Sequence, residues 1–180
     1  MIIFLSLEKI NSLSWDKLYA KDHDGLYPTD LESESPTAVA CFNKLLKAGV
    51  IDYEETFWSK RNAKVIGTAS TSSPNNNRPL TENENTAGYV MGLSTRSPTN
   101  LPILFDSSTE AGVFNANVWE GKAIVAKLKG SVKAMYISLF DHSVYNRNRG
   151  YILERRGDVF IDIFKKLPEG TTVLPPQLAQ

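Results

Sequence analysis

Asp22 and Asp24 are the acidic residues whose spacing comes closest to that of a metal site, because they flank His23 and precede Gly25. Oxygen ligands at alternate positions followed by a glycine are features of calcium-binding loops. A complete loop also needs further ligands and a closing glutamate at fixed spacing, and the acidic residues that follow do not match it. We therefore weigh a structural calcium ion at Asp22 and Asp24 against a helix-end turn with solvated carboxylates, and favour the turn. The sequence suggests no other cofactor.

Asp106 is the candidate catalytic residue, and it stands at the end of the apolar run Ile103–Phe105. With the hydroxyl residues Ser107–Thr109 it resembles the active-site phrase of aspartic peptidases, in which two aspartates share one proton and activate a water. Ser108 occupies the position of that family's glycine, and a single copy requires a symmetric homodimer or another aspartate. We favour an aspartate that caps a turn at a strand end. A small peptidase acting on proteins or mucin is the alternative.

Basic and aromatic residues gather in the last quarter of the chain. They are Tyr145, Arg147, Arg149, Tyr151, Arg155 and Arg156. Such a patch suits phosphate, sulfate or sialic acid, so host glycans and mucin are among the expected partners. The simpler interpretation is a solvated surface whose arginines form salt bridges.

Composition bounds the class of protein. The 180 residues are 42% hydrophobic and carry no net charge, which predicts one domain with a real core. No overall charge draws the chain to nucleic acid, so nucleic acid is not an expected partner. The single cysteine, Cys41, excludes an internal disulfide and lies in an apolar run typical of a buried position. The apolar start, Met1–Leu5, is far shorter than the roughly 20 residues of a membrane span.

Two helices are expected in the first third of the chain. Apolar residues at helical spacing predict one over residues 4–21. Ser35 is the expected N-cap of the second, with Pro36 at the first helical position and Gly49 as its left-handed end. Residues 68–86 read as a loop of low complexity.

Strands are predicted for most of the rest of the chain. Short apolar runs over 87–93 and 101–106 precede a hairpin formed by 122–129 and 132–139, and a last helix or strand covers 159–167. We therefore predict an α+β fold, in which an N-terminal helix and a short second helix pack on an antiparallel β-sheet meander. Residues 1–140 form this domain, and residues 141–180 are a C-terminal extension of it.

Four phrases along the chain resemble bacterial pilin-like proteins, the type II secretion pseudopilins among them. They are the helix-end segment Tyr19–Pro28, the apolar segment Leu45–Asp52, the strand Pro102–Asp106 and the hairpin turn Gly130–Val132. The resemblance covers roughly residues 15–138 in order. It departs from the family where the membrane-spanning front half of the first helix is missing.

The resemblance implies a non-catalytic head domain with a pilin-like fold and a truncated N-terminal helix. Such proteins assemble into filaments or take part in secretion and surface binding. The partners that it implies are other pilin-like subunits, secreted cargo or host glycans. The expected location is the cell envelope (periplasm or outer surface) or the outside of the cell, with membrane contact only through the missing N-terminal anchor.

Overall fold

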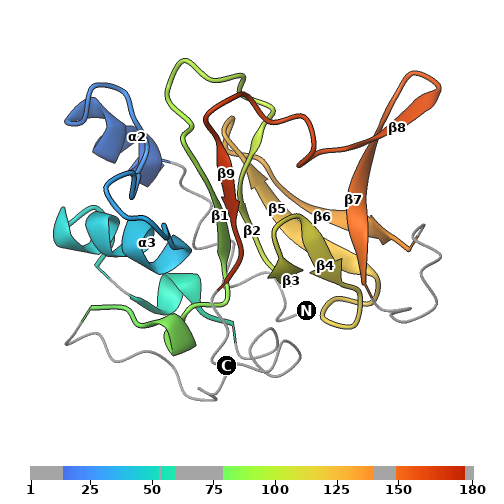
Figure 1. Ribbon diagram of the computed structural model, residues 1–180, viewed down its shortest axis with the longest axis horizontal. Coiled ribbons are helices and arrows are strands. Elements are labelled where there is room, and N and C mark those ends of the chain that lie inside the picture. The colour runs from blue at the N-terminus through green and yellow to red at the C-terminus, as the bar shows by residue number, and fades with distance from the viewer. Residues whose placement is uncertain (1–13, 53, 60–78, 140–148, 177–180) are drawn as a thin grey trace.

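A curled antiparallel sheet dominates the computed structural model, which describes residues 14–52, 54–59, 79–139 and 149–176. The sheet runs β3-β4-β7-β6-β5-β2-β1-β9, with β8 paired to β7, and curves into a nearly closed barrel (Figure 1). Its strands are β1 Gly88–Met91, β2 Pro102–Phe105, β3 Ser108–Glu110, β4 Val113–Asn115, β5 Lys122–Lys127, β6 Val132–Ser138, β7 Arg149–Arg156, β8 Val159–Asp162 and β9 Thr172–Leu174.

Two short α-helices lie together beside β1 at one side of the sheet, α2 (Ser14–Lys21) and α3 (Ala38–Lys47) (Figure 1). Two single turns of 3-10 helix, Glu54–Phe57 and Glu82–Glu84, accompany them. No helix among the described residues has the length and apolar character that crossing a membrane requires.

The predicted α+β fold with pilin-like layers is therefore wrong. Strands outnumber helices, and the helix expected over 4–21 is represented in the described residues only by α2. The prediction failed because β3 and β4 are only three residues long, and because β4 and β7 take partners that are distant in the sequence: β4 pairs with β7, and β7 pairs with β6. The segment 141–180, expected as an extension, contributes β7 between β4 and β6 and β9 beside β1.

Helix α3 matches its prediction at one end and departs from it at the other. Thr37, not Ser35, is the N-cap, and its hydroxyl accepts a hydrogen bond from the Ala40 N–H at 3.1 Å. The predicted left-handed Gly49 is confirmed at φ 65°. The Val50 N–H donates to the Leu45 carbonyl at 3.1 Å, which completes a Schellman end.

The β5–β6 hairpin is confirmed with a continuous register from Lys122 opposite Tyr136 to Ala126 opposite Val132. Gly130 takes φ 91° in the turn between the two strands, where a side chain would be strained.

The end of the predicted loop over 68–86 is ordered by side-chain contacts, while residues 68–78 lie outside the described residues. Glu84 is buried and accepts hydrogen bonds from the Thr81 N–H at 3.0 Å and the Thr81 hydroxyl at 2.6 Å. The amide of Asn85, also buried, exchanges two hydrogen bonds with the backbone of Ala87. Local polar bonds thus hold a segment that composition alone marked as irregular.

Aromatic rings fill the core. Phe105 of β2 meets Phe114 of β4 at 5.7 Å between centroids and Phe164 at 4.9 Å, both edge to face. On the helical side of the sheet, Phe42 stacks on Phe57 at 4.0 Å. Such geometry adds to the burial of apolar area that stabilises the fold.

Replacing Gly150 by alanine should separate β6 from β7. A Cβ at this position would lie 2.1 Å from the Ser138 carbonyl oxygen, which is backbone and cannot turn away. We expect Gly150→Ala to lower the free energy of unfolding in urea by about 3 kcal/mol. Gly157→Ala is the matched control, because it has φ 62° but open space around it, and should cost about 1 kcal/mol. Equal losses would contradict the close approach of the two strands.

Candidate functional site

The carboxylate of Asp106 lies at the end of β2 and is enclosed by hydrogen-bond donors. Asp106 is 3% exposed. Its oxygens accept hydrogen bonds from the Ile124 N–H at 2.7 Å, the Ser107 hydroxyl at 2.9 Å and the indole N–H of Trp119. The Asp106 N–H in turn donates to the Ile124 carbonyl at 3.1 Å. One side chain thus joins β2, β5 and the segment that precedes β5.

The backbone reverses at the next residue. Ser107 is buried and has φ 62°, in the left-handed region that residues other than glycine seldom adopt. Its carbonyl accepts a hydrogen bond from the Asn115 N–H at 2.7 Å. The contacts of Asp106 therefore sit where the chain leaves β2 and begins β3, which is the strand-end position expected from the sequence.

Burial and hydrogen bonding act on Asp106 in opposite directions. Burial raises the pKa of its carboxyl to about 6, and the bonds from Ile124, Trp119 and Ser107 lower it in part. At neutral pH the carboxyl group of Asp106 is therefore mainly ionised. The ionised form only accepts hydrogen bonds, which matches the three donors around it.

An aspartic peptidase needs a second carboxylate close enough to share a proton and a water between the two. Within the part of the chain that the structure describes, the contacts of the Asp106 carboxylate are all with donors. This arrangement holds a turn together. The carboxylate is 3% exposed, so it is buried away from a substrate in solution.

Asp22 and Asp24 both lie exposed in the turn after α2, and Asp24 has φ 51°. His23, between them, donates through Nδ1 to the Tyr19 carbonyl at 2.8 Å and stacks on the Tyr19 ring at 3.7 Å. In the described ranges no three potential ligands among His, Cys, Asp and Glu come together. A calcium ion at Asp22 and Asp24 thus stays a prediction from the sequence.

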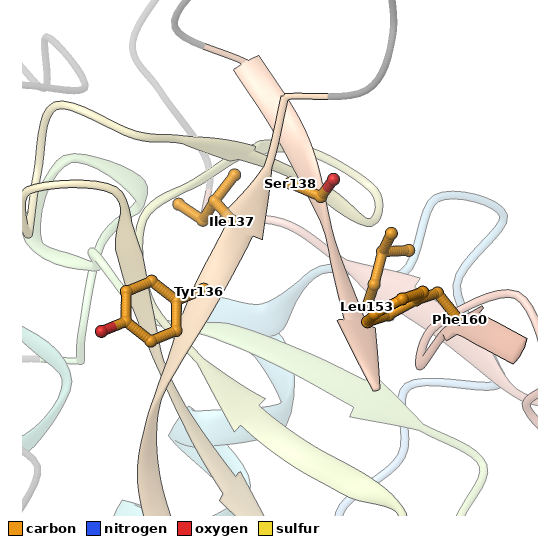
Figure 2. Close-up of a pocket in the computed structure, with 5 residues that line it drawn as sticks. All are labelled: Tyr136, Ile137, Ser138, Leu153 and Phe160. Carbon is orange, nitrogen blue, oxygen red and sulfur yellow. The ribbon is translucent and has the colours of Figure 1, made fainter. Parts of the chain in front are cut away.

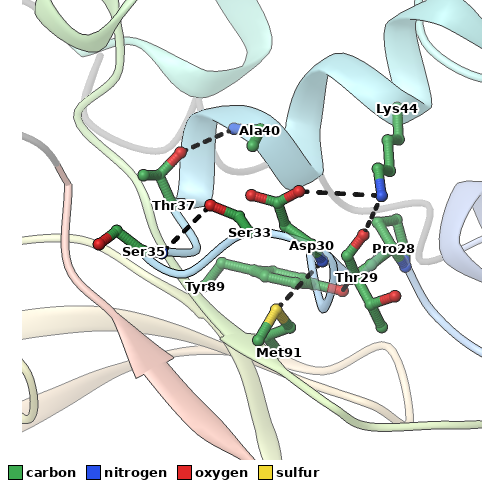
Figure 3. Close-up of polar contacts among 10 residues, drawn as sticks. All are labelled: Pro28, Thr29, Asp30, Ser33, Ser35, Thr37, Ala40, Lys44, Tyr89 and Met91. Atoms are coloured by element: carbon green, nitrogen blue, oxygen red, sulfur yellow. Dashed lines mark hydrogen bonds and ion pairs between the residues drawn. The ribbon is translucent and has the colours of Figure 1, made fainter.

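Asp30, the next aspartate along the chain, is held elsewhere. Lys44 of α3 reaches its carboxylate at 4.0 Å and also donates to the Thr29 carbonyl (Figure 3). The Tyr89 hydroxyl donates to the Pro28 carbonyl at 3.0 Å, and the Asp30 N–H contacts the Met91 sulfur at 3.2 Å. These contacts tie the segment before α3 to β1 and keep its carboxylate away from Asp22 and Asp24.

The arginines of the predicted basic patch that the structure describes each have a partner. Arg149 meets Glu110 at 2.5 Å, Arg155 meets Asp158 at 3.8 Å, and Arg156 meets Glu154 at 3.5 Å. Tyr145 and Arg147 lie outside the described residues. The salt-bridged surface that the sequence favoured is what these three arginines form.

The sequence did not reveal an open apolar pocket between β6 and β7. It has a volume of about 490 Å³ and is lined by Tyr136, Ile137, Ser138, Leu153 and Phe160 (Figure 2). Tyr136 is 73% exposed and Phe160 is 65% exposed. The one available signal was the apolar character of both faces of segment 132–139, which a half-buried strand does not need.

Lysines cover two tyrosine rings at and beside the pocket. The Lys122 ammonium lies 4.9 Å from the centre of the Tyr136 ring, and the Lys165 ammonium lies 5.0 Å from that of Tyr151. Tyr151 pairs with Ser138, which lines the pocket. The apolar surface is thus bordered by positive charge.

Comparison of the chain with models of known families, with curated proteins and with solved structures finds no match. Its function is therefore inferred from the geometry above.

Replacing Asp106 by asparagine should destabilise the fold. The amide NH2 would face one of three donors, so a buried donor would lose its acceptor. We expect Asp106→Asn to lower the free energy of unfolding by about 2 kcal/mol at neutral pH, measured by urea denaturation. An unchanged stability would show that the carboxylate does not hold the turn.

The pH dependence of stability carries a second signature of Asp106. Its folded-state pKa of about 6 lies above the ordinary value of 3.8. The part of its contribution to stability that comes from this shift is therefore complete below pH 3.8 and is lost as pH rises through 6. We expect up to about 3 kcal/mol of unfolding free energy to disappear over this window. Because other groups also titrate, the measurement is the difference between parent and Asp106→Asn. That difference should narrow as pH rises, and a constant difference would contradict the raised pKa.

Proposed function

We propose that this chain is a non-catalytic binding module of the cell envelope or cell exterior that holds a protein partner in the pocket between β6 and β7. The observation that carries the proposal is the exposure of Tyr136 and Phe160 at an open apolar pocket. Large apolar side chains gathered in the open are rare on proteins that act alone, and they mark interaction sites.

The exposed apolar residues are concentrated on β6, on β8 and at the residue that follows β6. Among the described residues, four of the seven large apolar side chains that are exposed belong to β6, β8 or the residue after β6. They are Tyr136, Leu139, Val159 and Phe160. Aromatic anchors beside an apolar depression are the features that dominate binding energy at protein interfaces.

The contacts of Asp106 support a non-catalytic role. A catalytic carboxylate must offer lone pairs to a water or substrate, whereas that of Asp106 is 3% exposed and is used by the backbone of Ile124 and the side chains of Ser107 and Trp119. These bonds give the residue a structural role.

The envelope location and the class of partner rest on the resemblance to pilin-like proteins in the phrases Tyr19–Pro28 and Pro102–Asp106. In such proteins the displayed head binds neighbouring subunits or secreted cargo. The fold differs from the layers expected of that family. We therefore rest only the proposed location and the class of partner on the resemblance. The proposed mode of binding rests on the pocket between β6 and β7.

Phe160→Ser should weaken peptide binding strongly, and Val159→Ser should not. Peptides selected from a random display library against the parent chain are the probe, with affinities measured by calorimetry. Phe160 lines the pocket, while Val159 is 61% exposed on the same strand and is absent from the lining. Loss of the apolar contact that Phe160 would bury against the bound peptide should weaken binding by roughly tenfold or more.

Two outcomes would contradict the proposal. One is equal loss of peptide binding in both variants, which would place the binding site elsewhere. The other is cleavage of an unfolded protein by the parent but not by Asp106→Asn, which would make Asp106 catalytic.

A further inference from the structure

The hydrogen bonds of β6 define which of its backbone groups face β5. The Ile137 N–H donates to the Gly121 carbonyl at 2.8 Å, and the Lys127 N–H donates to the Ser131 carbonyl at 2.9 Å. Backbone groups of successive residues in a strand point to opposite edges. Val132 and Ala134 therefore direct their N–H and C=O groups to the other edge of β6, toward β7.

Strand β7 presents the matching edge. The Ile163 N–H donates to the Ile152 carbonyl at 3.1 Å, so Ile152 faces the β8 side of β7. By the same alternation, Leu153 and Arg155 face β6. In the described part of the chain, β6 and β7 pair only at Ile137–Ile152 and Ser138–Tyr151.

Beyond these two pairs the strands diverge, as Figure 2 shows below Ser138. The continuing register would place Ala134 opposite Arg155, and this pair does not form within the described residues. Among the described residues, an open strand edge thus runs from Tyr136 to Val132, next to the apolar pocket. Such an edge is a template for an added strand.

Positive charge surrounds this edge. Lys133 on β6 and Arg155 on β7 are both exposed, and Lys122 and Lys165 lie over the rings of Tyr136 and Tyr151. Within the described part of the chain, Arg155 pairs with the carboxylate of Asp158, which is fully exposed and lies 3.8 Å away. An exposed pair of this length is easily exchanged for a partner's carboxylate.

We propose that the partner binds as an extended, acidic segment that adds a strand to the Val132–Tyr136 edge of β6 and places an apolar side chain between Leu153 and Phe160. This inference rests on the proposed function and names its partner class. Backbone pairing supplies the geometry of binding, and the apolar pocket and the surrounding cations select side chains of alternating character.

The experiment compares short synthetic peptides on the full chain. One peptide alternates valine and glutamate, and the second has lysine in place of each glutamate. We expect the glutamate peptide to bind roughly tenfold more tightly than the lysine peptide at low salt, because the exposed Lys133 and Arg155 belong to the two strands that border the edge. Its binding should slow hydrogen exchange of the Val132 and Ala134 amides.

Matched variants separate strand addition from simple charge attraction. Ala134→Pro removes one edge N–H and should weaken the glutamate peptide by roughly tenfold, while Ala134→Ser, which keeps it, should not. Lys133→Glu combined with Arg155→Glu should abolish the preference for glutamate. Lys47→Glu, an exposed change on α3, should leave that preference intact.

Equal binding of the two peptides, or binding without protection of Val132 and Ala134, would overturn this inference. If library peptides still need Phe160 in that case, the proposed function stands and only the strand-addition mode is wrong. If the glutamate peptide binds with the expected protection, the inference and the function are supported together.

Discussion

The fold depends on one buried carboxylate that accepts three hydrogen bonds. Asp106 takes its donors from Ser107 beside it, from Trp119 before β5 and from Ile124 within β5. Burying a charge is costly unless it is fully hydrogen-bonded, and here the donors converge because the chain turns sharply at Ser107. The turn directs β3 and β4 away from β2 and toward β7, so the carboxylate sets the path by which the sheet curls into a barrel.

A second polar contact fixes the other side of the barrel. Lys127 of β5 is 4% exposed and reaches Glu154 of β7 at 2.8 Å, although β6 lies between the two strands in the sheet. This bond, with smaller help from Arg156, holds the pKa of Glu154 below its usual value. Because the pair joins β5 to β7 directly, β7 is drawn away from the plane of β6. The short β6–β7 ladder and the pocket beside it follow from that constraint.

The sequence predicted those elements whose signals are local. The β5–β6 hairpin and the left-handed Gly49 after α3 are decided by neighbouring residues, and both are confirmed. β7 was not assigned because its polar sequence carries little local signal. It is held by the distant strands β4 and β6 as well as by β8, which follows it across a tight turn. The same limit applies to the site. Asp106 stood out by its position after an apolar run, but its bond to Trp119 is tertiary and left no local pattern.

The surface between β6 and β7 has to satisfy two opposing demands. An open edge beside exposed aromatic rings invites pairing with any other strand, including the same edge of a second copy. Lys133 and Arg155 oppose that outcome, since two copies meeting edge to edge would bring like charges together. The same charges attract a strand that carries carboxylates. One set of basic side chains therefore opposes self-pairing of the exposed edge and selects the chemical class of strand that we propose it accepts.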